Sequence, residues 1–203
     1  MSRFDACSRI LSELDVRCST FDVQIRMTND LSAEEVRALL KLEPHATCGF
    51  VRITFISNQR IAPGGLPAPF LDGRPAGSAL YFMVTSDAPV RLHRIRNDQL
   101  YHRYLGDPIE VLMLHEDGTS ERVVIGPDLQ ADQCLQLLIP GNTFHTARVI
   151  GRRRWFLGAS TEWPGVEKVD VEIGDVEALA AKYPDVADDL RAFSSEDSGN
   201  WPC

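Results

Sequence analysis

The chain has 203 residues, 44% of them hydrophobic and 25% charged, with a mean hydropathy of −0.15, as in an ordinary globular domain. Its formal charge is −8, and all of this excess lies after residue 160, where eleven acidic side chains stand against three basic ones. Nucleic acids require a basic footprint and a membrane span requires about 18 apolar residues, and neither is present. Charges also interrupt the first twenty residues, so no signal-peptide core is visible there. We expect a cytoplasmic protein with no nucleic-acid or membrane partner.

The first elements precede a clear change of pattern. Residues 1–30 are predicted as an N-terminal extension that is partly strand, because residues 20–28 (TFDVQIRMT) alternate apolar and polar side chains. Within residues 31–42, Ser32 and Glu35 form a capping box ahead of an apolar stripe. This spacing predicts a helix.

After residue 44 the chain consists of short segments bounded by turn residues. Short strands without intervening helices indicate an antiparallel sandwich or barrel. The predicted strands lie within residues 51–55, 78–86, 90–95, 109–115, 121–126, 134–140, 143–150, 154–160 and 166–173. A Pro/Gly-rich loop at 62–77 has a length that is more often functional than merely connecting.

Two short helices are predicted at residues 175–183 and 185–193, before a polar tail. We therefore expect an all-β core, a barrel with a leading helix over residues 31–174, followed by an acidic helical extension at 175–203.

Strand alternation assigns the chemically active side chains to faces. Arg91 and His93 share one face of their strand, and His145 shares a face with Val149. Glu110 lies on the same face as two leucines, and a carboxylate in such a position is either paired or functional.

In order along the chain, four stretches resemble the cupin superfamily, and in particular its cupin-5 branch, long catalogued as a domain of unknown function. They are LSAEEVRALLKLEPH leading into CGFVRITFIS, then SALYFMV, then RLHRIRNDQLYHRYLGDPIEVLML, and LIPGNTFHTAR before WFLGAS. The resemblance covers roughly residues 32–173 and implies a double-stranded β-helix barrel of the jelly-roll type. It also implies kinship with cupin sugar epimerases, which pair a histidine base with a tyrosine acid.

The superfamily's metal pattern is only partly kept. The resemblance places its first histidine at Arg91, its second at His93, its carboxylate at Asp98 or Gln99 and its later histidine at His145. A guanidinium has no lone pair to donate to a cation, but it suits a carboxylate or phosphate. We therefore expect no required metal, with a divalent transition metal on His93, His145 and Asp98 as the open alternative.

The leading hypothesis is an enzyme that transfers protons on a small anionic metabolite, an isomerase, epimerase or lyase. His93 would be the base, Tyr101 or Tyr81 the acid, and Arg91 with Arg52 the anchor for the anion. Further candidate pocket residues are His145, Phe144, Gln99, Glu110 and His102.

Blander interpretations stand beside it. The histidines could be hydrogen-bonded wall residues of a barrel, the protein could be a metal-dependent cupin oxygenase or lyase, or it could bind a ligand without turnover. Arg152, Arg153 and Arg154 suit a solvated turn, with an anion-binding rim as the alternative. The resemblance also implies a homodimer paired through β-strands, and residues 20–28 could join that interface or close an edge of their own barrel.

Overall fold

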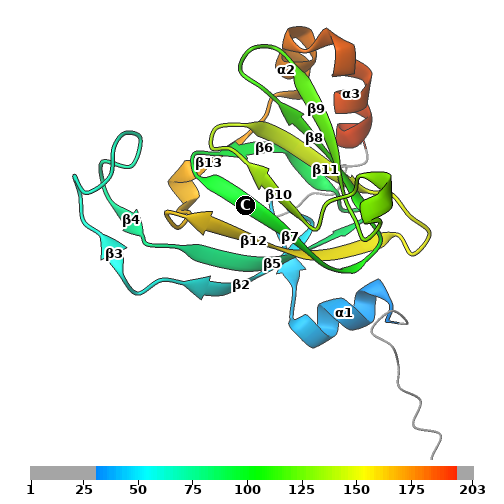
Figure 1. The fold of residues 1–203 in the computed structure, drawn as a ribbon, viewed down its shortest axis with the longest axis horizontal. Coiled ribbons are helices and arrows are strands. Elements are labelled where there is room, and N and C mark those ends of the chain that lie inside the picture. The colour runs from blue at the N-terminus through cyan, green and yellow to red at the C-terminus, as the bar shows by residue number, and fades with distance from the viewer. Residues whose placement is uncertain (1–30, 196–203) are drawn as a thin grey trace, which may run out of the picture.

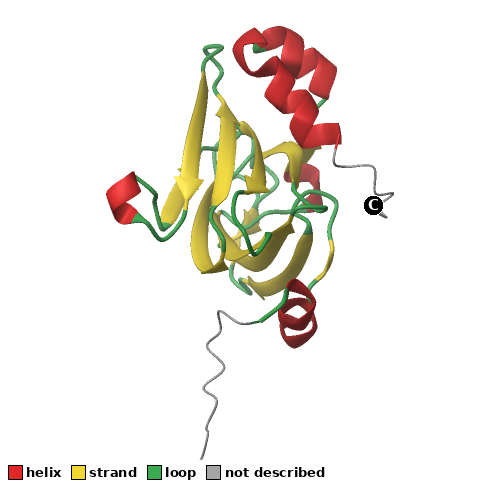
Figure 2. Ribbon diagram, turned by 90° about the vertical axis from the view of Figure 1, so that its right-hand side faces the viewer, coloured by secondary structure: helices red, strands yellow, loops and turns green. Residues whose placement is uncertain are grey.

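The computed structural model describes residues 31–195, so the predicted strand at 20–28 and the chain after 195 lie outside the described residues. Two antiparallel sheets face each other (Figures 1 and 2). The six-stranded sheet has the order β1 (Glu43–Pro44), β2 (Phe50–Ile56), β5 (Ser78–Thr85), β12 (Trp155–Trp163), β7 (Asp98–Gly106), β10 (Gln136–Ile139). The five-stranded sheet has the order β13 (Val171–Ile173), β6 (Val90–Ile95), β11 (Phe144–Val149), β8 (Ile109–Leu114), β9 (Ser120–Ile125).

The main core lies between the two sheets, because alternate side chains of each strand point inward. Phe82, Tyr101 and Phe156 come from the six-stranded sheet, and Val111 and Met113 come from the five-stranded one. All five are buried. The predicted all-β core of antiparallel strands is confirmed.

Helices cover the outer faces of both sheets (Figure 1). Helix α1 (Ala33–Leu40) lies over the six-stranded sheet, where Val36 packs with Met83 and Leu157. Helices α2 (Val176–Lys182) and α3 (Ala187–Ser195) cover the five-stranded sheet, where Leu190 packs with Leu112. The predicted leading helix and C-terminal helices are therefore confirmed. By covering the outer faces of the sheets, they bury strand side chains that do not point into the barrel. Short 3-10 turns complete the elements: η2 (Leu129–Ala131), η3 (Lys168–Asp170) and η4 (Pro184–Val186).

Local signals in the sequence explain several element boundaries. The Ser32 hydroxyl accepts a hydrogen bond from the Glu35 amide, and the Glu35 carboxylate accepts one from the Ser32 amide, at 3.2 and 2.9 Å. The predicted capping box is thus present, and such a cap stabilises a helix by about 1 kcal/mol. Gly118 turns the chain between β8 and β9 with a φ of 89°, a conformation that glycine adopts readily in a hairpin turn.

The long Pro/Gly loop is tied at its base. Strands β3 (Arg60–Ile61) and β4 (Arg74–Pro75) pair there, so the loop projects as an arm (Figure 1). Arg74 is fully buried and its guanidinium donates to both oxygens of buried Asp170, at 2.9 and 2.8 Å. This ion pair fixes the arm to the barrel.

None of the helices within residues 31–195 has the length and apolar character that crossing a membrane demands.

Candidate functional site

Three polar aromatic side chains from three strands meet inside the barrel. His93 lies on β6 and His145 lies opposite it on the adjacent β11, with ring centroids 4.3 Å apart. Tyr101, on β7 of the facing sheet, places its hydroxyl 3.0 Å from Nε2 of His145. The exposed fractions are 2% for His93 and 0% for the other two. We call these three side chains the histidine–tyrosine cluster.

Backbone carbonyls fix the orientation of both imidazoles. Nδ1 of His93 donates to the carbonyl of Arg91 at 2.7 Å, and Nδ1 of His145 donates to the carbonyl of Thr143 at 3.2 Å. Because a carbonyl can only accept, the proton of each neutral ring sits on Nδ1. Nε2 of His145 therefore accepts from the Tyr101 hydroxyl, and Nε2 of His93 carries a lone pair.

Burial keeps the cluster uncharged at neutral pH. Desolvation lowers the pKa of His93 to about 4, and the carbonyl of Arg91 opposes this only in part. Desolvation and the neighbouring His93 hold the pKa of His145 well below its ordinary value. Burial also raises the pKa of Tyr101 well above its ordinary value, so the phenol stays protonated. The cluster thus joins two neutral imidazoles to one neutral phenol.

A carboxylate that the sequence reasoning missed lies in the same interior. Glu162 is 3% exposed, on β12 opposite Gln99 of β7, and burial raises its pKa. It accepts hydrogen bonds from the hydroxyls of Ser160 and, at 2.6 Å, Ser78. The predicted strand at 154–160 stopped just short of it. Continuing the alternation from Phe156 would have put Glu162 on the inner face.

Cys48 is a second interior residue that was not among the predicted ones. It is buried beside the Tyr101 hydroxyl, and desolvation raises the pKa of its thiol to about 11. A thiol with this pKa stays protonated at neutral pH and behaves as a small wall residue. The sequence contained no signal for it beyond its position just before a strand.

Two other predicted residues lie at the cluster. Arg91 lies close enough to His93 to help lower the pKa of that imidazole by charge repulsion, and its guanidinium donates to the carbonyl of Ala46 at 3.3 Å. Gln99 shares the inner face of β7 with Tyr101 and is 4% exposed. The structure therefore brings together five of the predicted residues: Arg91, His93, Gln99, Tyr101 and His145.

On the six-stranded sheet, three predicted residues lie on the outer face, so placing them in the pocket was wrong. Tyr81 alternates with core residue Phe82 and packs edge-on against Tyr104, with ring centroids 5.9 Å apart. Arg52 is exposed and donates to the carbonyl of Leu40. The ring of His102 bonds to the side chains of Thr161 and Gln136, each at 2.9 Å.

Three more predicted residues are also outside the barrel. Phe144 packs under the C-terminal helices, with the Arg94 guanidinium 4.5 Å from its ring centroid. Glu110 is paired with Arg148 at 2.8 Å. Asp98 is exposed and accepts from the amide of Gly141 at 2.8 Å. Each of these residues lies on the strand face that the C-terminal helices or solvent cover. The other face of each strand is the one that points into the barrel.

The donor set does not fit a metal ion. Within residues 31–195, no group of three or more His, Cys, Asp or Glu side chains is arranged to hold one. Asp98 points away from the two histidines, Nε2 of His145 is already bonded to Tyr101, and Glu162 is held by two hydroxyls. A transition metal with two imidazoles would need a third ligand, and within residues 31–195 no third His, Cys, Asp or Glu side chain is grouped with the two histidines to supply it.

Facing antiparallel sheets around two buried histidines define a protein of the cupin class. The chain belongs to the family described as Cupin superfamily (DUF985), whose model matches residues 34–174. No protein among the curated ones matches it.

Solved structures agree on the fold. A hypothetical protein from Leishmania major is 23% identical, with a TM-score of 0.71, over 80% of this chain and 98% of its own. A protein from Shewanella oneidensis gives the same identity and TM-score, over 80% and 97%. An oxalate decarboxylase from Bacillus subtilis is 12% identical over 72% of this chain and 35% of its own, with a TM-score of 0.43, which is too distant to inform function.

Proposed function

We propose that the protein is a small-molecule enzyme that transfers a proton on a small anionic metabolite, as an isomerase, epimerase or lyase. The observation that supports this is the histidine–tyrosine cluster, in which a phenol donor and an imidazole acceptor from facing sheets meet in a buried interior. Acid–base catalysis needs a proton donor and acceptor held at fixed positions. Both backbone-bonded imidazoles are held in this way.

His93 is the base in this proposal. Its Nδ1 bond to the Arg91 carbonyl holds the ring, and Nε2 keeps its lone pair. A pKa of about 4 makes it a weak base when no anion lies beside it. An anionic substrate beside it raises that pKa, because an opposite charge favours the imidazolium. The base therefore becomes effective only when an anion is bound.

Tyr101 is the acid, and it works together with His145. Its pKa is raised by burial, so its proton is available to a carbanion or enolate. Without a substrate the hydroxyl donates to Nε2 of His145, so it turns from His145 to the substrate when it gives up its proton. Arg91, on β6 two residues before His93, is the side chain suited to the substrate's carboxylate or phosphate.

The cluster is almost inaccessible to solvent, at 0 to 2% exposure. A substrate reaches Nε2 of His93 only if the barrel opens, and closure around it then excludes water. Such exclusion protects a carbanion from side reactions.

Hydrogen exchange tests the proposal. Anionic metabolites are first screened by thermal shift, and each ligand found is then incubated with the protein in D2O and followed by proton NMR. We expect enzyme-dependent loss of one C–H signal, abolished in His93→Asn and Tyr101→Phe. The matched controls are His102→Gln and Tyr104→Phe, which change a histidine and a tyrosine on the outer face. Saturable binding without any exchange would instead support a ligand-binding module without turnover.

We also propose that two copies pair through β2. Strand β1 covers only Phe50 and Val51, so the rest of this strand is an open sheet edge within the described residues. Ile53, Phe55 and Ile56 on it are 61, 55 and 51% exposed. An exposed apolar edge strand is a ready template for pairing with another strand. A second copy of this chain offers the same apolar edge.

A further inference from the structure

Two adjoining clefts lie at one end of the barrel, away from the histidine–tyrosine cluster. The helix-side cleft has a volume of about 490 Å³ and lies between the start of α1, the end of β5 and the start of β12. The loop-side cleft has a volume of about 420 Å³ and lies along the loop between β11 and β12. They share Thr85, Ser86 and Arg154. Each has the size of a small-molecule site.

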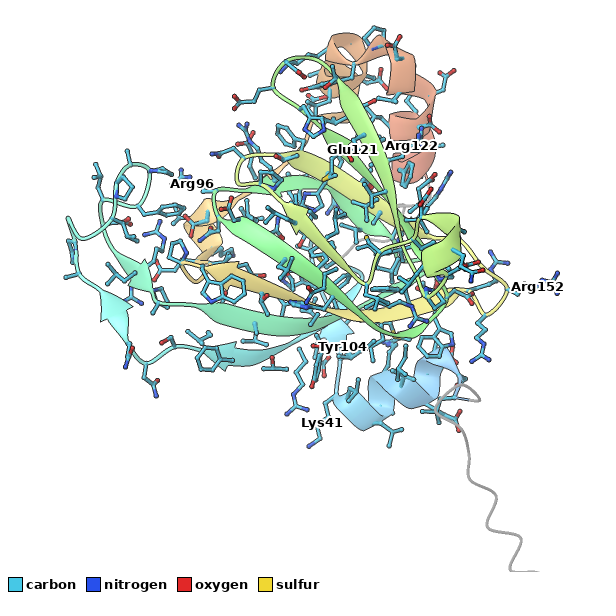
Figure 3. The ribbon with its side chains drawn as sticks, viewed as in Figure 1. Lys41, Arg96, Tyr104, Glu121, Arg122 and Arg152 are labelled. Carbon is cyan, nitrogen blue, oxygen red and sulfur yellow. The ribbon has the colours of Figure 1, made fainter. Side chains whose placement is uncertain are left out.

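The clefts gather positive charge on a chain whose net charge is −8. Arg148, Arg152 and Arg154 line the loop-side cleft and no acidic residue does, but the charge of Arg148 is already paired with Glu110. The helix-side cleft adds Arg37 and Arg153 and includes two acidic residues, Glu34 and Asp87. Figure 3 shows Arg152 at the outer tip of this loop, with its side chain directed away from the barrel.

The loop holds Arg154 in place through its backbone. The amide of Arg154 donates to the Asp107 carboxylate at 2.7 Å, and its φ is 65°, in the left-handed region. This conformation costs a residue other than glycine about 1 kcal/mol. The guanidinium of Arg154 makes no hydrogen bond or ion pair to any of residues 31–195. The backbone of Arg154 is therefore held in place while its guanidinium is available to bind an anion.

Two buried donors at the clefts have no partner within the described part of the chain. Thr85 is 7% exposed and lines both clefts, and its hydroxyl makes no hydrogen bond. The Nε of Arg37 is also buried without a partner, while its guanidinium stacks 3.6 Å above the Phe50 ring. An unpaired buried polar group is costly, and a native structure usually has a reason for it. Both atoms are closed to solvent, so the acceptor oxygens of a ligand reach them only after these side chains turn towards the clefts.

We propose that the two clefts together bind a phosphorylated small molecule. The phosphate lies between Arg154 and the hydroxyls of Thr85 and Ser86, because arginine forks and hydroxyls match phosphate oxygens. The organic part lies in the helix-side cleft, whose lining includes the aromatic side chains of Phe50 and Trp155. This site is separate from the barrel interior, where the proton-transfer site is proposed.

Calorimetric titration of the full chain with inorganic phosphate and with phenyl phosphate tests the proposal. We expect saturable binding of both, tighter for phenyl phosphate and weaker at higher salt. Arg154→Asn, which keeps a residue that tolerates a positive φ, should weaken binding about tenfold or more, and Thr85→Val about fivefold. Arg60→Ala is the matched control, since Arg60 lies on the arm beside Glu167. It should bind as the wild type does, as should His93→Asn.

Thermal unfolding without ligand separates binding from folding. Thr85→Val should unfold at the same or a higher temperature than the wild type, because a methyl group replaces an unpartnered hydroxyl. Weaker phosphate binding in this undamaged variant supports the site. Unchanged affinity in both Arg154→Asn and Thr85→Val, or no saturable binding to the wild type, would overturn it. Equal affinities for the two probes would overturn the organic part of the proposal.

Discussion

The buried His93 should make the protein acid-labile in a defined pH window. Its pKa is 6.5 in an unfolded chain and about 4 in the fold. Below pH 6.5 the imidazole is therefore protonated in the unfolded state but not in the folded state. The free energy of unfolding decreases as the pH is lowered, until the folded imidazole is also protonated near pH 4. Stability from this group is thus present above about pH 6.5 and lost on acidification.

The size of the loss follows from the same two values. At pH 5 the unfolded imidazole is almost fully charged and the folded one is almost fully neutral. This difference in protonation lowers the free energy of unfolding by about 2 kcal/mol between pH 7 and pH 5, and by about 3 kcal/mol over the whole range between the two pKa values. His145, whose pKa is also lowered, adds to the loss. Glu162 acts in the opposite sense because burial raises its pKa.

Urea unfolding at pH 7 and pH 5 measures this effect, with buried Trp155 as the fluorescent reporter. The matched variant is His93→Asn, whose amide nitrogen takes the place of Nδ1 and keeps the bond to the Arg91 carbonyl. The wild type should lose about 2 kcal/mol more than this variant on going from pH 7 to pH 5. The comparison cancels the contribution of Glu162 and the part of the His145 contribution that comes from desolvation, while the part that His93 causes is counted with His93. If both proteins lose the same free energy, His93 is not held neutral by burial and the reasoning fails.

Three further perturbations have expected outcomes. Arg74→Met leaves the Asp170 carboxylate buried without its partner and should lower the free energy of unfolding in urea by about 3–5 kcal/mol. The double variant with Asp170→Leu should recover most of this loss. No recovery would mean that the unpaired Asp170 carboxylate does not cause the loss. Phe55→Lys should convert a dimer into a monomer in light scattering, while Leu39→Lys, an equally exposed apolar site on α1, should not; a wild type that is monomeric at all concentrations refutes pairing through β2. Elemental analysis of protein purified without chelators should find transition metal well below one ion per chain, and a stoichiometric metal would contradict the proposed donor assignment.

Local signals in the sequence predicted most of the elements, but β7, which carries Gln99 and Tyr101, was not among the predicted strands. The capping box at Ser32 starts α1 as predicted. The alternation that puts His145 and Val149 on one face is present in β11, whereas the register of β6 shifts between Val90 and His93, so the predicted alternation from Arg91 to His93 is interrupted there. Alternation is a property of each strand alone, so it could be inferred without knowing what the strand packs against.

Only the tertiary structure decided which face is the interior. Glu110 does share a face with Leu112 and Leu114, but this face lies under the C-terminal helices. Its carboxylate is there paired with Arg148. A strand's pattern carries no information about which of its two apolar faces closes the barrel, because that depends on helices far away in the sequence.

The contacts that make the candidate site are equally nonlocal. Tyr101 and His145 are 44 residues apart and belong to opposite sheets, yet their side chains share a hydrogen bond. Tyr81 seemed just as suitable as an acid in the sequence, but it points to the outer face. The sequence by itself determined which side chains were candidates for the proposed proton transfer. The packing of the two sheets against each other determined which of these side chains meet. Desolvation inside the barrel then keeps the imidazoles and the phenol uncharged.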